Sequence, residues 1–256
     1  MAVYPLMMAQ PGLEIHRTQS AVLDAIRSLI DSAEESLTVA VPISALSELV
    51  TQLSAAIERD VLVLLLVHGD ETVPTPPYED IATAVRTIEN NITPLLVTAD
   101  TQRGLTGHSG MLTDSIAGYQ ATKFDNKNLA HDQFTMFLGS HWLMGTERYV
   151  ADVCEFPRTF SAFQFAVLMS ALALRAGTAI TARARVISTA DRTETTISGP
   201  VINARQSLVY PASSTNPAER SLTIETEDGP VTVGGSGATK EAYECLKITI
   251  DRVADE

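Results

Sequence analysis

The 256-residue chain contains few cysteines, few basic residues and no long apolar run, and each scarcity excludes a class of protein. The two cysteines, Cys154 and Cys245, belong to no CxxC pair, which excludes a disulfide framework and a thiolate metal site. No stretch of about 18 apolar residues is present, so the sequence predicts no membrane-spanning helix. The first residues lack the basic segment of a secretory signal, and Pro5 and Pro11 interrupt them. We therefore expect a cytoplasmic protein with no membrane partner.

Basic residues number 18 against 31 acidic residues, and the net charge is −13. A charge of this sign repels phosphate backbones, so we expect no direct binding to nucleic acid. Arginine outnumbers lysine, 14 to 4. We interpret an acidic composition that keeps arginine as a halophilic adaptation, because abundant carboxylates stay hydrated in concentrated salt. The alternative is an ordinary acidic protein.

Helical spacing and uninterrupted apolar runs alternate in the first part of the chain. The runs at 37–41 and 61–67 are typical of central strands that are buried on both faces. The patterns predict helices at 18–35, 44–58, 78–90, 128–144 and 161–176, and strands at 37–41, 61–67, 92–97, 110–115, 116–124 and 149–154. This order predicts an α/β fold with right-handed crossovers and a parallel sheet.

After Gly177, which suits the end of the last predicted helix, the sequence becomes rich in threonine, isoleucine and valine in alternating patterns. Asp228-Gly229 is a hairpin signal between two such runs. We therefore predict two domains: an α/β subdomain over residues 1–177, and a small, mostly antiparallel β domain, a barrel or a sandwich, over residues 178–256.

The one glycine-rich stretch, Gly234-Gly235-Ser236-Gly237, lacks the lysine of a phosphate-binding loop. It precedes a predicted short helix over 239–244. Two interpretations are open: a tight turn only, or a loop that presents backbone N–H groups to a polar ligand. The five histidines show no metal-ligand spacing, and no serine lies in a GxSxG elbow, so we predict no metal and no cofactor.

A parallel sheet of this kind resembles the phospholipase D superfamily, whose chemistry needs His-x-Lys-x4-Asp. The nearest stretch here is His108-Ser109-Gly110, with Gly110 in the lysine position and Asp114 one residue early. We therefore expect this half to be catalytically inert, and the protein not to be an enzyme.

Several stretches resemble TrmB-type archaeal transcriptional regulators. Residues 13–42 are similar to the start of that family's effector-binding region, and residues 129–142 are similar to its helix ending in tryptophan, here Trp142. Three later stretches are similar to the haloarchaeal branch: Phe156-Pro-Arg-Thr-Phe, Ala171-Leu-Ala-Leu-Arg-Ala-Gly-Thr-Ala-Ile and Glu225-Thr-Glu-Asp-Gly-Pro-Val-Thr-Val-Gly-Gly-Ser-Gly-Ala. The resemblance implies an inert phospholipase D-like subdomain joined to a β domain that binds a sugar effector.

The resemblance also implies a ligand site, because the family's glycine turn falls on Gly234 and Gly235 and its helical glutamate on Glu241. Where the family often has asparagine, Arg220 precedes Ser221. Arginine has donors but no acceptor, so an anionic or phosphorylated ligand suits this position better than a neutral sugar. We therefore expect these five residues to bind a small-molecule effector, a sugar or a sugar phosphate.

No winged helix and no heptad segment precedes Leu13 in this sequence. The leading hypothesis is thus the ligand-sensing module of a TrmB-like regulator without its own DNA-binding domain, acting as a homodimer or as a heterodimer with full-length regulators. One alternative is a structural interaction protein that binds no small molecule. A phosphodiesterase is the less favoured alternative.

Overall fold

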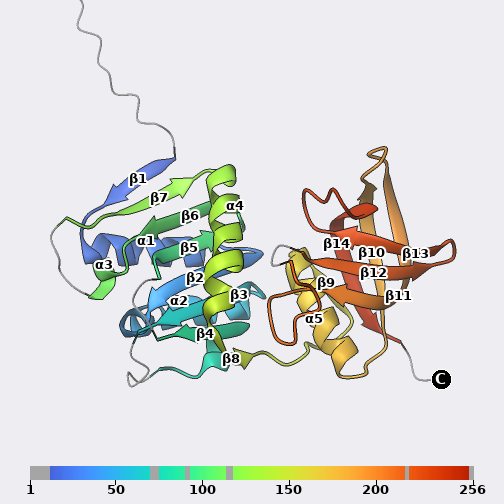
Figure 1. Ribbon diagram of the computed structural model, residues 1–256, viewed down its shortest axis with the longest axis horizontal. Coiled ribbons are helices and arrows are strands. Elements are labelled where there is room, and N and C mark those ends of the chain that lie inside the picture. The colour runs from blue at the N-terminus through green and yellow to red at the C-terminus, as the bar shows by residue number, and fades with distance from the viewer. Residues whose placement is uncertain (1–11, 70–74, 90–92, 114–117, 217–218, 254–256) are drawn as a thin grey trace, which may run out of the picture.

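The structure, a computed structural model, describes residues 12–69, 75–89, 93–113, 118–216 and 219–253 (Figure 1). The first of its two sheets runs in the order β1-β7-β6-β5-β2-β3-β4-β8. Its strands are β1 Leu13–His16, β2 Ser36–Pro42, β3 Leu62–His68, β4 Ala84–Ile88, β5 Leu95–Ala99, β6 Arg103–Gly107, β7 Ala121–Asp125 and β8 Thr146–Val150. Only the β2–β3 and β3–β4 pairs are parallel among these described strands, and the rest are antiparallel. The predicted α/β class is confirmed, but the sheet is mixed rather than wholly parallel.

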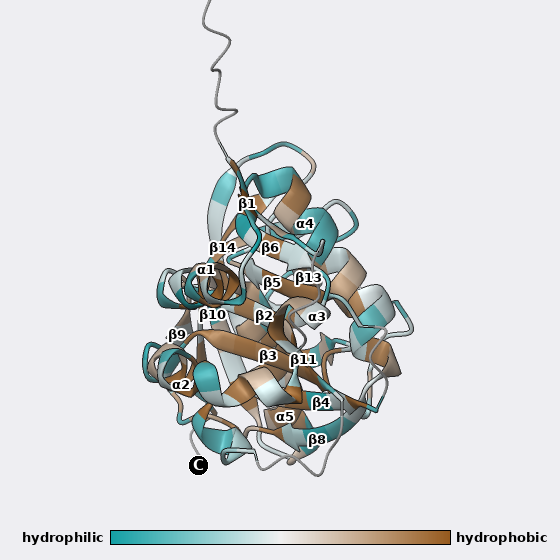
Figure 2. Ribbon diagram, turned by 90° about the vertical axis from the view of Figure 1, so that its left-hand side faces the viewer, coloured by the Kyte–Doolittle hydropathy of each residue, from teal (hydrophilic) through white to brown (hydrophobic). Residues whose placement is uncertain are grey.

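Helices cover both faces of this sheet, which explains why all seven residues of β2 and of β3 are buried. The helix α1 (Gln19–Asp31) packs on β5 and β6, and α2 (Val50–Glu58) packs on β3. The opposite face carries α4 (Lys127–Met136), which continues as a π-helix, η3 (Phe137–Trp142), and crosses in front of the sheet in Figure 1. Figure 2 shows β3 as a hydrophobic strand beneath helices with hydrophilic outer faces.

Sequence patterns were misleading where the elements are short. The predicted helix at 78–90 is wrong, because only Tyr78–Asp80 is helical (η2) and β4 follows. Every residue of β4 is buried between β3 and β8, and this packing outweighs the helical spacing. The predicted helix at 44–58 divides at Leu49 into a 3-10 segment, η1 (Ile43–Glu48), and α2.

Of the two strands predicted at 110–115 and 116–124, the first is wrong, and the second is confirmed in part as β7. Residues 110–113 form a short helix, α3 (Gly110–Thr113), and the strand β7 ends the segment, while residues 114–117 lie outside the described part. The strands β1 and β6 have no counterpart in the prediction, because β1 is a four-residue edge strand and β6 contains two glycines.

The second sheet runs in the order β10-β11-β12-β13-β14-β9, and β10 also pairs with β14, which closes a small barrel. Its strands are β9 Arg158–Phe160, β10 Ile180–Ser188, β11 Glu194–Arg205, β12 Ser221–Thr226, β13 Gly229–Gly234 and β14 Tyr243–Arg252. All pairs are antiparallel except the short β13–β14 contact. The mostly antiparallel β domain is therefore present.

The helix α5 (Phe163–Arg175) packs on β9, β10, β11 and β14, and it ends before Gly177 at φ +75°, a conformation that favours glycine. Both β9 and α5 thus lie with the second sheet, and the structural division falls before Arg158, earlier than the predicted division after residue 177.

One hydrophobic core joins the two halves. It runs from the α4 face of the first sheet, at Leu66 and Leu96, through Phe137 and Trp142 to α5 and the inner side of the barrel. A second core lies between the first sheet and the helices α1, α2 and α3. The two subdomains are therefore packed as neighbours with a continuous apolar interior.

Candidate functional site

The hairpin β12–β13 positions most of the predicted ligand residues. Its register places Ser221 directly opposite Gly234, and the turn at its other end has Gly229 at φ +106°. The hairpin predicted from Asp228-Gly229 is therefore confirmed. Ser221 and Gly234 are both buried, and Arg220 immediately precedes the pair.

Glu241 folds back onto the glycine turn. A Cβ placed on Gly234 would lie 2.8 Å from a Glu241 carboxylate oxygen, so the carboxylate rests directly against the backbone of Gly234. The Thr189 hydroxyl donates to the Glu241 carbonyl at 2.8 Å and fixes the backbone of this segment. The predicted short helix at 239–244 is wrong: these residues form bends, and β14 begins at Tyr243. The structure nevertheless brings Ser221, Gly234 and Glu241 together.

The turn is held by Glu244, a residue that sequence reasoning missed. The Gly237 N–H donates to one carboxylate oxygen of Glu244 at 3.0 Å, and Arg192 forms an ion pair with the other at 3.0 Å. These contacts, chiefly the Gly237 hydrogen bond, lower the pKa of Glu244. Gly237 has φ +78°, which favours glycine there. Contacts within the protein thus fix the conformation of the turn.

Gly235 faces the other side, toward the amino-terminal end of α5. A Cβ on Gly235 would lie 3.3 Å from the Phe163 ring, so a larger residue would press on that ring. The residue before the helix, Ala162, offers no side-chain cap. Backbone N–H groups of the first helical turn therefore receive no side-chain acceptor from the cap position.

Arg220 points to a different neighbour. Its guanidinium lies over the Phe134 ring of α4, 5.2 Å from the ring centroid, and does not join the contacts between Gly234 and Glu241. Its Nη1 atom is buried and has no hydrogen-bond partner in the part of the chain that the structure describes. Burial lowers the pKa of Arg220 to about 10, so the group is still cationic at neutral pH.

A second buried arginine, Arg86 of β4, links the two subdomains, and sequence reasoning did not identify it. Its Nη1 donates to the Trp142 carbonyl at 2.9 Å, and its Nη2 lies 3.6 Å from the Glu147 carboxylate. The Trp142 indole in turn donates to the Leu208 carbonyl at 2.7 Å, in the segment between β11 and β12. No local pattern could have revealed this cluster, because its members are far apart in the chain.

The phospholipase-like stretch has no catalytic arrangement in the described residues. The Gly110 N–H donates to Nδ1 of His108 at 3.0 Å, and the His108 ring stacks on Tyr119 with centroids 3.9 Å apart. Asp114 lies outside the described part. Among the residues that the structure describes, no group of three or more His, Cys, Asp or Glu side chains could hold a metal ion.

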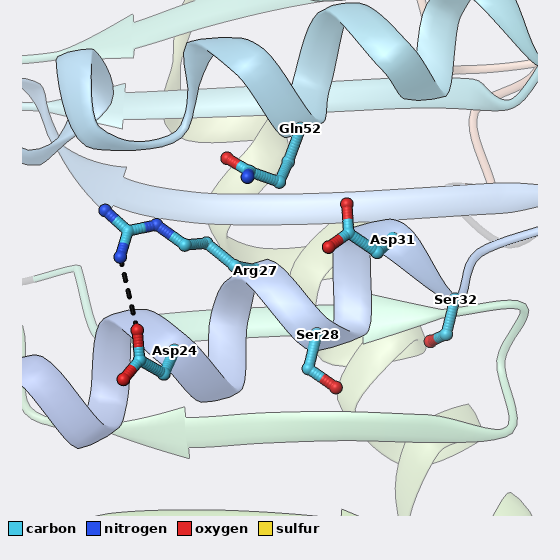
Figure 3. A pocket seen from close by; sticks show the side chains of 6 residues that line it. All are labelled: Asp24, Arg27, Ser28, Asp31, Ser32 and Gln52. Carbon is cyan, nitrogen blue, oxygen red and sulfur yellow. Dashed lines mark hydrogen bonds and ion pairs between the residues drawn. The ribbon is translucent and has the colours of Figure 1, made fainter.

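A polar groove of about 480 Å³ lies on the outer surface of α1 and α2, on the face of the sheet opposite α4 (Figure 3). The Arg27 guanidinium at its edge pairs with Asp24 at 3.2 Å and with Glu48 at 2.8 Å, so its charge is already compensated. The groove contains none of the five predicted ligand residues. Within the described ranges, no helix has the length and apolarity needed to span a membrane.

Comparison with solved structures finds partial similarities of low identity. The phospholipase D family member Nuc from Salmonella typhimurium is 21% identical, covers 54% of this chain and 98% of its own, and gives a TM-score of 0.41. NucT from Helicobacter pylori is 11% identical over 53% of this chain and 98% of its own, with a TM-score of 0.42. TrmBL2, an archaeal chromatin protein, is 8% identical over 56% of this chain and 57% of its own, with a TM-score of 0.43. Comparison with curated proteins finds no match.

Two family models match consecutive parts of the sequence. Residues 12–149 match the N-terminal subdomain of the effector-binding domain (EBD) of the transcriptional regulator TrmB. Residues 155–253 match the C-terminal subdomain of the TrmB/TrmBL1 effector-binding domain. The boundary between the two matches agrees with the structural division before β9. The chain therefore belongs to the TrmB family of transcriptional regulators and contains both subdomains of its effector-binding domain.

Proposed function

We propose that this chain senses a sugar or sugar derivative, which binds at the glycine turn formed by Gly234, Gly235 and Glu241. The observation that carries the proposal is the Glu241 carboxylate packed against a residue without a side chain. A carboxylate accepts hydrogen bonds from sugar hydroxyls, and the absence of a side chain at Gly234 leaves the room that the Glu241 carboxylate and the Ala238 methyl group occupy. In the described part of the chain, the Glu241 carboxylate makes no hydrogen bond to another side chain, so its acceptor sites are free.

A thermal-shift assay with glucose, maltose and glucose 6-phosphate tests this proposal. A ligand that binds only the folded state must raise the melting temperature. We expect at least one sugar to raise it, and Glu241→Gln, which removes the charge with little change of volume, to abolish the shift. Glu227→Gln, at the exposed tip of the β12–β13 hairpin, is the matched control and should leave the shift unchanged. A shift that survives Glu241→Gln would contradict this location.

We further propose that the chain has no phosphodiesterase activity. Hydrolysis needs a free histidine nucleophile next to a cation, whereas Nδ1 of His108 accepts from the Gly110 backbone and the lysine position is glycine. Incubation with bis(p-nitrophenyl) phosphate should release no nitrophenol above background. Release that is lost in His108→Ala would contradict the proposal.

Effector occupancy would act through association with a second copy of the chain or with full-length regulators. The alternative, a purely structural interaction protein, has one observation in its favour: Glu244 and Thr189 hold the turn through hydrogen bonds within the protein. The alternative predicts no thermal shift with any of the three sugars.

A further inference from the structure

Arg220 is a half-buried cation that no carboxylate neutralises in the described part of the chain. Burial alone lowers the pKa of Arg220, and no acidic group raises it again. Other arginines that are removed from water have such partners: the partly buried Arg158 pairs with Asp60 at 2.7 Å, and the buried Arg86 lies 3.6 Å from Glu147. Removing a charge from water without a partner is unfavourable, so buried charges are normally paired.

The nearest acid along the chain is already engaged. One carboxylate oxygen of Glu219 accepts from Arg205 Nε at 3.0 Å, and the other accepts from the Ser214 hydroxyl at 2.5 Å. Both carboxylate oxygens of Glu219 thus have partners other than the guanidinium that follows it in sequence. The counter-charge of Arg220 therefore has no source in its own segment.

Phe134 fixes the orientation of Arg220 without supplying a negative charge. The guanidinium carbon lies 5.2 Å from the ring centroid, within the range of a cation–π contact. Such a contact covers one face of the planar group and leaves the N–H groups at its edge free to donate. Nη1 is such a donor: it is buried and makes no hydrogen bond.

We propose that Arg220 binds the phosphate group of a phosphorylated sugar, whose hydroxyls bind at the Gly234–Glu241 turn. The guanidinium fork matches phosphate through two parallel hydrogen bonds. Arg220 is adjacent to Ser221, and Ser221 pairs directly with Gly234, so the backbones of Arg220 and Gly234 lie close together in one hairpin, while the guanidinium lies over Phe134. Directly paired residues in antiparallel strands have Cα atoms only about 5 Å apart. This inference rests on the proposed function and specifies the charge of its ligand.

Isothermal titration of the full chain with glucose, glucose 6-phosphate, glucuronate and inorganic phosphate tests the inference at fixed ionic strength. We expect glucose 6-phosphate to bind at least 10-fold more tightly than glucose, as a charged hydrogen bond contributes roughly a factor of 10 to 100. Arg220→Gln should abolish this discrimination. Arg183→Gln, on the exposed side of β10, is the matched control and should preserve it.

Folding of the variant is monitored separately. Arg220→Gln removes an uncompensated buried charge, so its melting temperature should equal or exceed that of the wild type. Inorganic phosphate should raise the melting temperature of the wild type but not that of Arg220→Gln. Chloride at equal ionic strength should change the melting temperatures of the two proteins by the same amount.

The possible failures are distinguishable. Glucose binding that equals or exceeds glucose 6-phosphate binding, and that is lost in Glu241→Gln, would overturn this inference and support the proposed function. Glucuronate bound as tightly as glucose 6-phosphate would overturn the assignment to phosphate. A wild type that binds no member of the series would overturn both.

Discussion

At the scale of single residues, the interior of this protein contains charged and titratable groups whose surroundings differ. Arg86 is 1% exposed and is tolerated because two carbonyl groups, a carboxylate and two aromatic rings surround it. His68, at the end of β3, is 2% exposed, and neither of its ring nitrogens has a hydrogen-bond partner among the described residues. Arg86 is stabilised by its partners, whereas His68 is tolerated because its ring can stay neutral.

Replacing Arg86 should therefore weaken folding and the contact between the subdomains. Arg86→Met removes the hydrogen bond to the Trp142 carbonyl and leaves that group buried, so we expect a loss of about 2–4 kcal/mol in the free energy of unfolding. Urea denaturation measures this loss. Arg183→Met on the exposed side of β10 is the control and should change the free energy by less than about 0.5 kcal/mol. Equal stability of the two variants would contradict the role given to Arg86.

The pH dependence of stability tests His68. Burial lowers its pKa from 6.5 to about 4 in the folded state, so the folded state binds a proton less readily than the unfolded state. Stability from the neutral ring is complete above pH 6.5 and is lost as the pH falls toward 4, by about 3 kcal/mol in total. The unfolding free energy of His68→Leu should not show this loss between pH 6.5 and pH 4. Parallel pH profiles of unfolding free energy for the wild type and the variant would show that His68 titrates normally.

At the scale of elements, one glycine shapes the barrel. Gly199 of β11 has φ +156°, and a Cβ there would lie 1.8 Å from the Glu225 carbonyl oxygen of β12. The β11–β12 register also shifts nearby, between Val201 and Asn203. The close approach of the two backbones therefore depends on the absence of a side chain.

We expect Gly199→Ala to destabilise the chain by about 3 kcal/mol, because the clash is with backbone and the strand must move. Gly139→Ala is the contrasting variant: its Cβ would meet nothing within 4 Å, and it lies in the π-helix that extends α4. Alanine there should stabilise by roughly 0.5–1 kcal/mol. Thermal unfolding of Gly199→Ala and Gly139→Ala measures both changes in stability. A Gly199→Ala protein as stable as the wild type would contradict the close packing of β11 on β12.

The helices and strands differ in how well the sequence predicts them. Long periodic segments such as α1 and α5, and apolar runs such as β2 and β3, were predicted because burial on one or both faces leaves a pattern in the sequence. The five residues of β4 carry no such pattern, and their conformation is decided by pairing with β3 and β8. For the site, Gly234 and Glu241 followed from the family resemblance, but Glu244, Phe134 and Arg86 depend on contacts between distant segments.

At the scale of the whole molecule, acidic charge is unevenly distributed between the two halves. Residues 1–177 contain 20 acidic and 10 basic residues, and residues 178–256 contain 11 and 8. The excess repels itself and opposes the compact state in dilute salt. The excess of acidic residues lies mainly outside the barrel that contains the glycine turn.

Salt should therefore stabilise the protein. Raising KCl from 0.1 M to 1 M shortens the screening length from about 10 Å to about 3 Å, so repulsion between surface carboxylates declines. We expect the melting temperature to rise by about 5 °C, which corresponds to roughly 1–2 kcal/mol for a chain of this size. A melting temperature that is constant or falls over this range would contradict the halophilic interpretation.

We propose above all that an effector binds at the glycine turn of the barrel. Hydrogen–deuterium exchange of the wild type, with and without saturating glucose 6-phosphate, tests it most directly. We expect slower exchange in residues 219–222 and 234–241, with no change along the α1–α2 groove that contains Asp24, Arg27 and Gln52. Protection confined to that groove, or no protection anywhere, would contradict it.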